Sequence, residues 1–350
     1  MKRIIALILS TAIVLSLGAC SNASSSSASV GSSTTAASAD GEKTYDKVKL
    51  KMSCNGTDQA NDTKTAKRIA QLVSERSNGA VQITVYNNDQ LASGDMSKGL
   101  ELVLDGTVDM DCHSTSIISN LDNRLMVSTL PWIFSDYQAA EDAFWGTGGE
   151  FIDSVLQEKG LTYLGAVHNG FKMMTSSKRL IKTPEDLKGL KMRIPGGEFF
   201  SAFYKAYGAS PQAMSWSEVF SALQQGTIDG HDNSISTCVS NNIQEVQKYF
   251  TVSRHTYEAF TFMANSKKFA ALSEDTQQLI RDCVEEACKA ENQEIVNNES
   301  NLIKKCEDEY GCEFYELTAD DIAAFRSPID SLINEYKEAY GADACAAFNV

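Results

Sequence analysis

The sequence lacks the short motifs that mark the common catalytic sites. It contains no GxSxG, GxxxxGK[ST] or HExxH, and no GxGxxG follows a predicted strand. It also has only four histidines, none with a partner at metal-ligand spacing on a helix. We therefore expect a protein that is not an enzyme and that uses no cofactor or metal ion.

Basic residues and long apolar runs are also scarce. Lys and Arg number 31 against 46 Asp and Glu, so the formal net charge is -15. This charge argues against a protein that binds nucleic acid over its surface, and any anion site must be a local cluster of cations. Beyond the first residues, no segment is apolar for the ~18 residues that a membrane-spanning helix needs.

Cysteines with the spacing of zinc ligands are absent, because there is no CxxC and no paired Cys/His pattern. The chain has nine cysteines. Cys306 could pair with Cys312 across a turn, and Cys54 with Cys112 if their strands are neighbours. Buried free thiols are the alternative.

The start of the chain carries an export signal. Lys2 and Arg3 precede the apolar run "IIALILSTAIVLSL", which ends at "LGAC". Residues 1–19 are therefore predicted to be a signal peptide. "LGAC" resembles the lipobox of bacterial lipoproteins, which implies that Cys20 is acylated. The serine-rich residues 20–44 are predicted to be a flexible linker behind this anchor. We expect an exported protein, lipid-anchored to the outer face of the cytoplasmic membrane.

The rest of the chain alternates strand and helix patterns. "VKLKMSCN" and "AVQITVY" read as strands, and the segment between them places apolar residues at helical spacing. This order predicts an α/β fold, and its repetition further along predicts a second sheet. No proline occurs from Ser273 to Tyr310, which predicts one long helix lying across two domains.

Polar or charged side chains recur near the ends of the predicted strands. In open α/β sheets, ligands bind outside the carboxyl ends of the strands, so this pattern indicates a binding cleft. The residues are Asn55, His113, His168, Asn169, Lys172, Arg193 and Asn233.

Four blocks of the sequence resemble one known family. "SNGAVQITVYNNDQL", "LPWIFSDYQAAEDAF", "TPEDLKGLKMRIPGG" and "GASPQAMSWSEVFSALQQGTIDGHDNS" occur in this order. They are similar to the DctP-type solute-binding proteins of tripartite ATP-independent periplasmic (TRAP) transporters. The resemblance covers the chain from about Lys47 to Gly341.

This resemblance implies an α/β fold of the two-domain periplasmic-binding-protein (Venus flytrap) type, with crossing strands and a long bracing helix. The expected domain I comprises 45–169 and 258–295, and domain II comprises 170–257 and 296–350. The family implies a monomer that captures an organic acid in the cleft. It would deliver this acid to the small and large membrane subunits of a sodium-coupled TRAP permease.

The resemblance also assigns roles to individual residues. Arg193, in "LKMRIP", stands where the family grips the substrate carboxylate, a task that suits the two parallel donors of a guanidinium. Asn233 is expected to add a hydrogen bond. Lys172 replaces the second arginine of many members and loses the bidentate grip. Trp216 falls where relatives place an aromatic ring beside the ligand.

Other positions carry over more loosely. Asn55 and His113 match places that contact the far end of the ligand. His168 and Asn169 are expected at a hinge or strand end. His231 replaces a common glutamine and is expected at the surface.

The ligand class stays open between a sugar acid and a C4-dicarboxylate. With His113, Met96 and Ser97 where sialic-acid binders have charged residues, sialic acid is not expected. Two alternatives stay open: a sensor subunit with the same fold that presents its ligand to a receptor, or, from another class, an exported enzyme with His113 or His231 as a base.

Overall fold

A computed structural model describes residues 43–350 of the chain. The predicted signal peptide, the predicted lipid anchor Cys20 and nearly all of the predicted linker lie outside the described residues. Within the described part, no helix combines the length and the apolar character that crossing a membrane requires.

The first sheet contains five strands in the order β2-β1-β3-β10-β4. β1 pairs in parallel with β2 and β3, whereas β10 is antiparallel to both β3 and β4. Leu50, Met52 and Cys54 of β1 are buried and alternate with exposed Lys49 and Lys51, as the sequence pattern predicts. The strands are β1 (Val48–Cys54), β2 (Val81–Tyr86), β3 (Met110–Ser114), β4 (Leu161–Phe171) and β10 (Tyr257–Asn265).

The second sheet contains six strands in the order β11-β9-β5-β8-β6-β7. Its central strand β8 pairs in parallel with β6 and antiparallel with β5. A β-carbon on Gly230 would come within 2.0 Å of the Thr175 carbonyl oxygen, so glycine is required where β8 and β5 meet. The strands are β5 (Met173–Ser176), β6 (Lys191–Ile194), β7 (Ser210–Ala213), β8 (Gly230–Asn233), β9 (Tyr249–Val252) and β11 (Glu313–Glu316).

Two short connections join the sheets. Lys172 alone separates β4 of the first sheet from β5 of the second, and residues 253–256 lead from β9 back to β10. These crossings confirm the predicted two-domain α/β fold. The exact bounds of the two domains stay a prediction.

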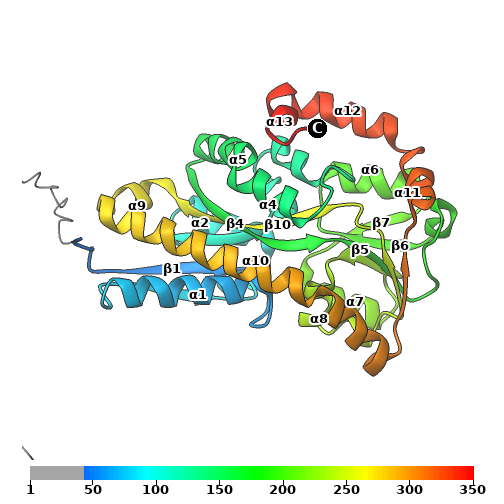
Figure 1. Ribbon diagram of the computed structural model, residues 1–350, viewed down its shortest axis with the longest axis horizontal. Coiled ribbons are helices and arrows are strands. Elements are labelled where there is room, and N and C mark those ends of the chain that lie inside the picture. Colours follow the sequence, from blue (N-terminus) through cyan, green and yellow to red (C-terminus); the bar gives the residue numbers. More distant parts are fainter. Residues whose placement is uncertain (1–42) are drawn as a thin grey trace, which may run out of the picture. The chain divides into compact units, whose positions relative to one another are not determined.

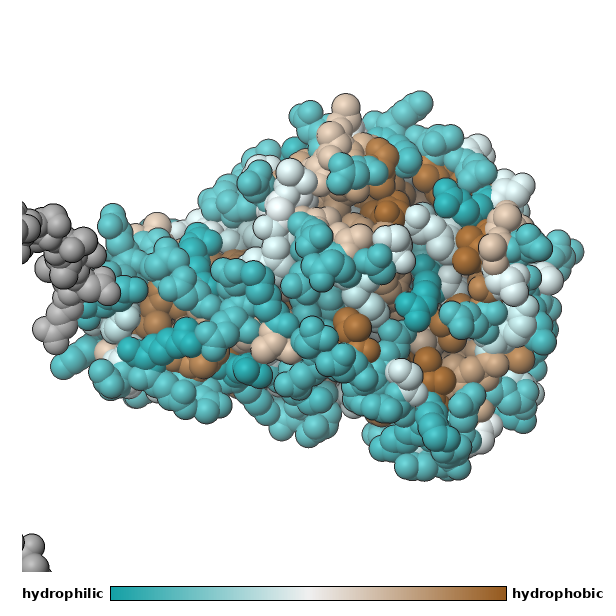
Figure 2. Space-filling model, in the orientation of Figure 1, coloured by the Kyte–Doolittle hydropathy of each residue, from teal (hydrophilic) through white to brown (hydrophobic). Residues whose placement is uncertain are grey.

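The long helix α10 (Glu274–Tyr310) has 37 residues and confirms the predicted brace. The Ser273 hydroxyl accepts from the Thr276 amide at its start, and Gly311 ends it in the left-handed conformation. In Figure 1, α10 crosses diagonally from α1 (Asn61–Arg76) towards α8 (Ile235–Ser240), and it contacts both. Figure 2 shows the same side of the molecule, and this face is mainly hydrophilic. This is expected where the outer side of α10 is exposed to solvent.

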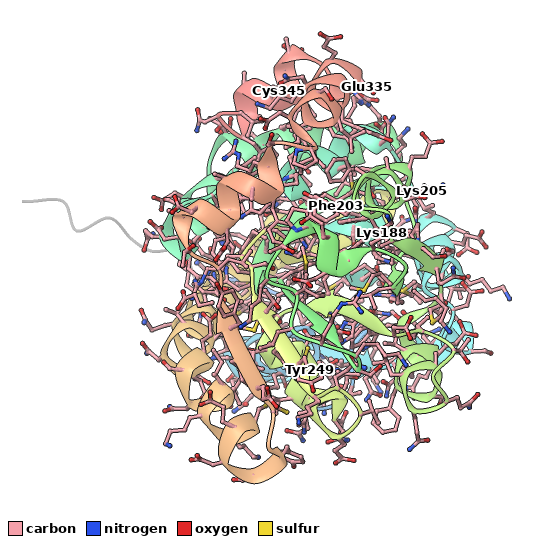
Figure 3. All side chains as sticks on the ribbon, turned by 90° about the vertical axis from the view of Figure 1, so that its right-hand side faces the viewer. Lys188, Phe203, Lys205, Tyr249, Glu335 and Cys345 are labelled. Atoms are coloured by element: carbon pink, nitrogen blue, oxygen red, sulfur yellow. The ribbon has the colours of Figure 1, made fainter. Side chains whose placement is uncertain are left out.

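The remaining helices cover the sheets, and their apolar faces form the cores. Phe203 of α6 is buried whereas Lys205 of the same helix is exposed, and Figure 3 labels both. The other α-helices are α2 (Met96–Leu104), α3 (Thr115–Ile118), α4 (Tyr137–Trp145), α5 (Thr147–Glu158), α6 (Glu198–Ala206), α7 (Trp216–Gln224), α9 (Ser266–Ala270), α11 (Ala319–Arg326), α12 (Asp330–Tyr340) and α13 (Ala342–Ala347). The 3-10 helices are η1 (Gln90–Ala92), η2 (Asn123–Thr129), η3 (Pro184–Leu187) and η4 (Ile243–Glu245).

Neither predicted disulfide is present, because all eight cysteines in residues 43–350 are free thiols. Cys54 and Cys112 are nevertheless paired in register on adjacent strands β1 and β3, as expected of neighbouring strands. The Cys312 amide donates to the Cys306 carbonyl at the end of α10. Seven of the eight thiols are buried.

His168 is buried in β4, close to where this strand leaves the first sheet. Its backbone amide donates to Asn292 of α10, and its Nδ1 lies 2.5 Å from the Tyr257 hydroxyl. Burial lowers the pKa of His168 to about 3. Glu141 Oε2 lies 3.7 Å from Nε2 and accepts a hydrogen bond from Asn292 Nδ2. The ring is therefore neutral where α10 meets the crossing strand.

This buried neutral histidine predicts a loss of stability in mild acid. Because the unfolded chain takes up the proton below about pH 6.5 and the folded protein does so only near pH 3, stability falls as the pH decreases through that window. The contribution of His168 is about 2 kcal/mol between about pH 8 and about pH 5. Denaturant melts of His168→Gln at both pH values are expected to show a smaller difference than wild type.

Tyr257→Phe is the matched control, because it removes the hydrogen bond to the ring but keeps the titrating group. It is expected to retain the full pH dependence. A His168→Gln protein with an unchanged pH dependence would contradict the assignment.

Candidate functional site

A pocket lies between the two sheets, at the ends of strands from both. Five of the six residues predicted to bind a ligand line it together, although they come from five separate segments of the chain. These five are Asn55, Lys172, Arg193, Trp216 and Asn233. The pocket is also lined by Gly56, Ala60, Met96, Ser114, Ser116, Ile117, Asn169, Pro195, Thr237, Asn241, Glu258 and Phe260.

Arg193 reaches the pocket because it alternates with core residues on β6. Met192 and Ile194 are buried in the hydrophobic core, and Arg193 points to the opposite face. Its Nε and Nη2 donate to the Met214 carbonyl at 3.1 and 2.9 Å, and the guanidinium lies 5.3 Å from the Trp216 ring centre. No acidic residue of the described part forms an ion pair with it. Burial lowers the pKa of Arg193 to about 10, so it stays charged at neutral pH.

Asn233 ends β8 on the same wall of the pocket. Its Oδ1 accepts from the Ser234 amide at 3.0 Å and from Asn169 Nδ2 at 3.3 Å. Its Nδ2 donates to no group of residues 43–350 and is therefore free for a ligand. Asn169, expected at a hinge or strand end, lines the pocket and also donates to Glu258.

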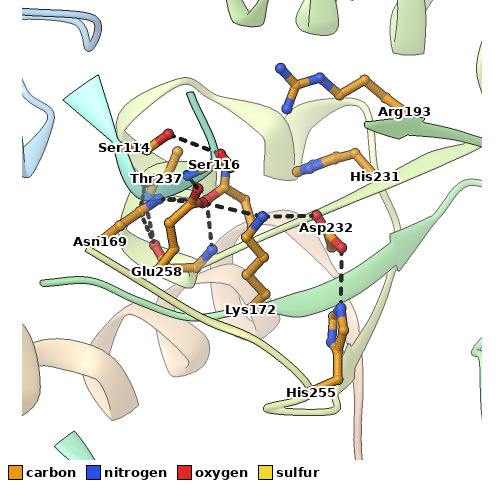
Figure 4. Close-up of polar contacts among 12 residues, drawn as sticks. Ser114, Ser116, Asn169, Lys172, Arg193, His231, Asp232, Thr237, His255 and Glu258 are labelled. Atoms are coloured by element: carbon orange, nitrogen blue, oxygen red, sulfur yellow. Dashed lines mark hydrogen bonds and ion pairs between the residues drawn. The ribbon is translucent and has the colours of Figure 1, made fainter. Parts of the chain in front are cut away.

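The Lys172 ammonium forms ion pairs with carboxylates on both sheets. Its Nζ lies 3.4 Å from Asp232 on β8 and 3.2 Å from Glu258 on β10 (Figure 4). The side chain is 2% exposed. Lys172 thus belongs to the pocket wall as predicted, but its charge is already compensated by two partners.

Asp232 is held by several further groups. Its carboxylate accepts from the Tyr204 hydroxyl at 2.6 Å and lies 3.1 Å from His255 Nε2. The His255 ring stacks on Phe203 at an angle of 16°. This network connects β8 to α6 and to the second crossing connection.

His231 is buried, so its expected surface position is wrong. It lies on β8 in register with Arg193, and its ring packs edge-on against Trp216 with the centres 5.7 Å apart. Neither ring nitrogen has a hydrogen-bond partner among the described residues. Burial lowers the pKa of His231 to about 4, which keeps the ring neutral. The alternation of side chains along this strand, on either side of Asp232, was the sequence signal that could have indicated a buried His231.

His113 does not line the pocket, and this corrects its expected position. Its side chain is fully buried, with Nδ1 beside Asp111 and Nε2 3.0 Å from Asp89. Although burial lowers it, these two carboxylates raise the pKa of His113 well above its usual range. Asn55, which does line the pocket, donates from Nδ2 to Asp89. His113 therefore supports a pocket residue from behind.

Sequence reasoning missed Glu258 and the hydroxyl groups of the pocket. Glu258 lies on β10, a strand that the sequence pattern did not identify. Its carboxylate accepts from the Ser116 amide at 3.0 Å and from Asn169 at 3.3 Å. A lone acidic residue in the apolar run "YEAFTFMAN" was the available signal.

The arrangement suits one bound anion. Figure 4 shows Arg193 on one side of the site and Ser114, Asn169 and Thr237 on the other, with Lys172 between them. Within the described chain, Arg193 and Asn233 have donors without an acidic partner, whereas the Lys172 ammonium is paired with two carboxylates. Within residues 43–350 no cluster of side chains could hold a metal ion.

The buried ion pairs of Lys172 predict a large stability effect. Lys172→Met leaves Asp232 and Glu258 buried without their cation, so the free energy of unfolding is expected to fall by about 3–5 kcal/mol. Lys178→Met is the matched control, because Lys178 lies 3.5 Å from Asp229 but is exposed. Its loss is expected to cost less than about 1 kcal/mol. Equal losses in urea melts of the two variants would contradict the assignment.

Comparisons with known proteins agree with this architecture. The family model described as "Bacterial extracellular solute-binding protein, family 7", DctP, matches residues 52–339. The C4-dicarboxylate-binding periplasmic protein DctP of Rhodobacter capsulatus is 34% identical over 285 residues, which is 81% of this chain and 85% of that protein.

Two solved structures have the same fold. A TRAP periplasmic solute-binding protein from Sulfurospirillum deleyianum with bound succinate has a TM-score of 0.81 and 26% identity, covering 87% of this chain and 99% of that one. A TRAP periplasmic solute-binding protein from Polaromonas bound to D-erythronate has a TM-score of 0.81 and 27% identity, covering 86% and 98%. The family match, the shared two-domain fold and the long helix together show that this chain belongs to the DctP family of TRAP solute-binding proteins.

Proposed function

We propose that this protein captures an organic acid anion in the pocket between its two sheets, outside the cytoplasm. The ligand carboxylate lies on the Arg193 guanidinium and accepts a further hydrogen bond from Asn233 Nδ2. One observation carries this proposal: Arg193 is a buried cation that forms no ion pair with an acidic residue of the described part. A buried charge without a counter-ion is costly, so an anion that enters here stabilises the site.

The walls around Arg193 suit this role. A guanidinium presents parallel donors that match the two oxygens of a carboxylate, and Nη1 donates to no group in residues 43–350. The Trp216 ring packs against the guanidinium, which favours a cation at this position. Both relatives with a bound ligand named above hold an organic acid, which supports the same ligand class here.

Contacts across the mouth of the cleft support a closing motion. The Ser217 hydroxyl of α7 donates to the Gly94 carbonyl at 3.2 Å, and the Thr57 hydroxyl donates to the Ser240 carbonyl at 3.2 Å. Each bond joins a loop beside the first sheet to a helix beside the second. Because they are few and lie near the surface, they can break and re-form as the domains open and close.

We further propose that the protein is lipid-anchored through Cys20 and delivers its ligand to a sodium-coupled membrane permease. The membership in a TRAP family and the lipobox-like "LGAC" support this step. Within this scheme, the acid is released when the domains open at the permease. The protein itself acts as a monomer and leaves the acid chemically unchanged.

The central role of Arg193 gives a direct test. Arg193→Ala is expected to lose about 2–5 kcal/mol of binding free energy, which is roughly 30- to 5,000-fold in affinity, because the ligand carboxylate loses the one cation of the described pocket lining that has no acidic partner. A thermal-shift screen of sugar acids, dicarboxylates and keto acids identifies an acid that binds, and calorimetry then measures its affinity for both proteins.

Lys191→Ala is the matched control, since Lys191 lies two positions earlier on β6 and its Nζ, as far as the described residues show, bonds only to the Gly226 carbonyl. It is expected to bind like wild type. Near wild-type affinity of Arg193→Ala for the same acid would refute the proposed site.

A further inference from the structure

The amide side chains that line the pocket have orientations set by their partners. An amide presents a donor on its nitrogen and an acceptor on its oxygen, so a ligand must match whichever end faces it. The two ends are normally assigned from the surrounding hydrogen bonds. Each pocket asparagine has at least one partner that can only donate or can only accept a hydrogen bond. This partner fixes which end of the amide is the oxygen and which is the nitrogen.

On the wall that carries Arg193, the free amide end is a donor. The Asn233 oxygen accepts from a backbone N–H, that of Ser234, which can only donate. Its Nδ2 therefore faces the pocket. Arg193 and Asn233 together form a donor wall, which suits the two oxygens of one carboxylate.

Asn55 lies on the loop after β1, opposite this wall. It presents the other end of its amide, the oxygen, to the pocket. Its Nδ2 donates to the Asp89 carboxylate, which can only accept when ionised. His113 holds Asp89 from behind with Nε2 3.0 Å from Oδ1. The Asn55 Oδ1 accepts from no group in the described part of the chain and remains for the ligand.

Asn241 also presents an acceptor. Its Nδ2 donates to the Thr237 carbonyl at 2.9 Å and to the Ser240 hydroxyl at 3.1 Å. A backbone carbonyl can only accept, so Oδ1 is the end left over. The bond from Thr57 to the Ser240 carbonyl brings the loop after Asn55 next to this residue. Figure 4 places Thr237 on the side of the site away from Arg193.

The charges of the site also limit the ligand. Apart from the histidines, Lys172 and Arg193 are matched by Asp232 and Glu258, so positive and negative charges are equal before an anion binds. A monoanion adds one charge, which Arg193 receives. A dianion adds a second charge, for which the described lining holds no unpaired cation, because Lys172 already contacts two carboxylates.

We propose that the pocket selects a hydroxylated monocarboxylate, such as an aldonic acid, over a dicarboxylate. The carboxylate lies on Arg193 and Asn233, and hydroxyl groups further along the ligand donate to Asn55 Oδ1 and Asn241 Oδ1. A second carboxylate at that end would place its oxygens, which accept hydrogen bonds, against Asn55 Oδ1 and Asn241 Oδ1, which also accept. The inference rests on the proposed function, since it assumes that the ligand is an organic acid held by Arg193.

Calorimetry on the full mature protein with matched acids tests this selectivity. D-Erythronate and succinate have the same number of carbon atoms and differ in hydroxyl groups and in the second carboxylate. D-Gluconate and fumarate extend each class. A hydroxylated monocarboxylate is expected to bind at least about tenfold more tightly than either dicarboxylate.

The outcomes separate the two proposals. Equal or tighter binding of succinate or fumarate, lost in Arg193→Ala, would overturn the selectivity but leave the proposed function in place. If none of the four acids binds, the selectivity is overturned, and the thermal-shift screen of further organic acids then decides the proposed function.

Asp89→Asn provides a second, independent test. The amide that replaces the carboxylate can donate from its nitrogen to Asn55, which an ionised carboxylate cannot do. Asn55 then accepts with Oδ1 and turns its Nδ2 into the pocket, replacing an acceptor by a donor. Asparagine also suits the left-handed backbone at this position, where φ is 46°. The ratio of the succinate to the D-erythronate affinity is expected to rise about tenfold.

Asp111→Asn is the control, because it removes the same charge from the His113 cluster but leaves the carboxylate to which Asn55 donates. It is expected to change both affinities by the same factor. Thermal melts establish that both variants are folded. An unchanged affinity ratio in folded Asp89→Asn would overturn the role of Asn55.

Discussion

The buried ammonium of Lys172 between Asp232 and Glu258 is the interaction on which the rest of the site depends. Lys172 is the single residue between β4 of the first sheet and β5 of the second, and its two partners lie on different sheets. Three buried charges at one crossing are tolerated only because they compensate one another and accept further hydrogen bonds. The same contacts hold the pocket walls in register where the chain passes between domains.

This compensation separates the roles of the two buried cations. Lys172 has two carboxylate partners, whereas among residues 43–350 Arg193 bonds only to the Met214 carbonyl and packs on Trp216. Within this part of the chain, a ligand carboxylate therefore meets one cation without an acidic partner rather than two. The contrast follows from the partners that the fold supplies and not from the charge of the residues themselves.

Groups behind the pocket determine what the pocket surface offers. His113 lies between Asp89 and Asp111, and Asp89 in turn orients the amide of Asn55. Gly99 permits this cluster, because a β-carbon there would come within 2.8 Å of the Asp89 carboxylate and 2.9 Å of the His113 ring. The cleft is thus built from a first layer that meets the ligand and a second layer that sets its donor and acceptor directions.

The sequence by itself determined the local structure and the identity of the family. The hydrophobic period and the absence of proline predicted the α/β elements and the long helix α10, because these signals depend on neighbours a few residues apart. The resemblance to a known family selected Arg193 rather than Lys191 on the same strand face, which periodicity could not do. It also predicted that Asn55, Lys172, Trp216 and Asn233 belong to the same ligand site.

Only the tertiary structure decided which polar side chains are buried and with which partners. The partners of Lys172 lie 60 and 86 positions away in the sequence, and the pairing of His113 with Asp89 joins a strand to a distant loop. Two expectations failed for this reason: His113 lies behind the pocket, and His231 is buried rather than exposed. The free energy of a charged or amide group is set by contacts far away in the chain, which local sequence patterns do not contain.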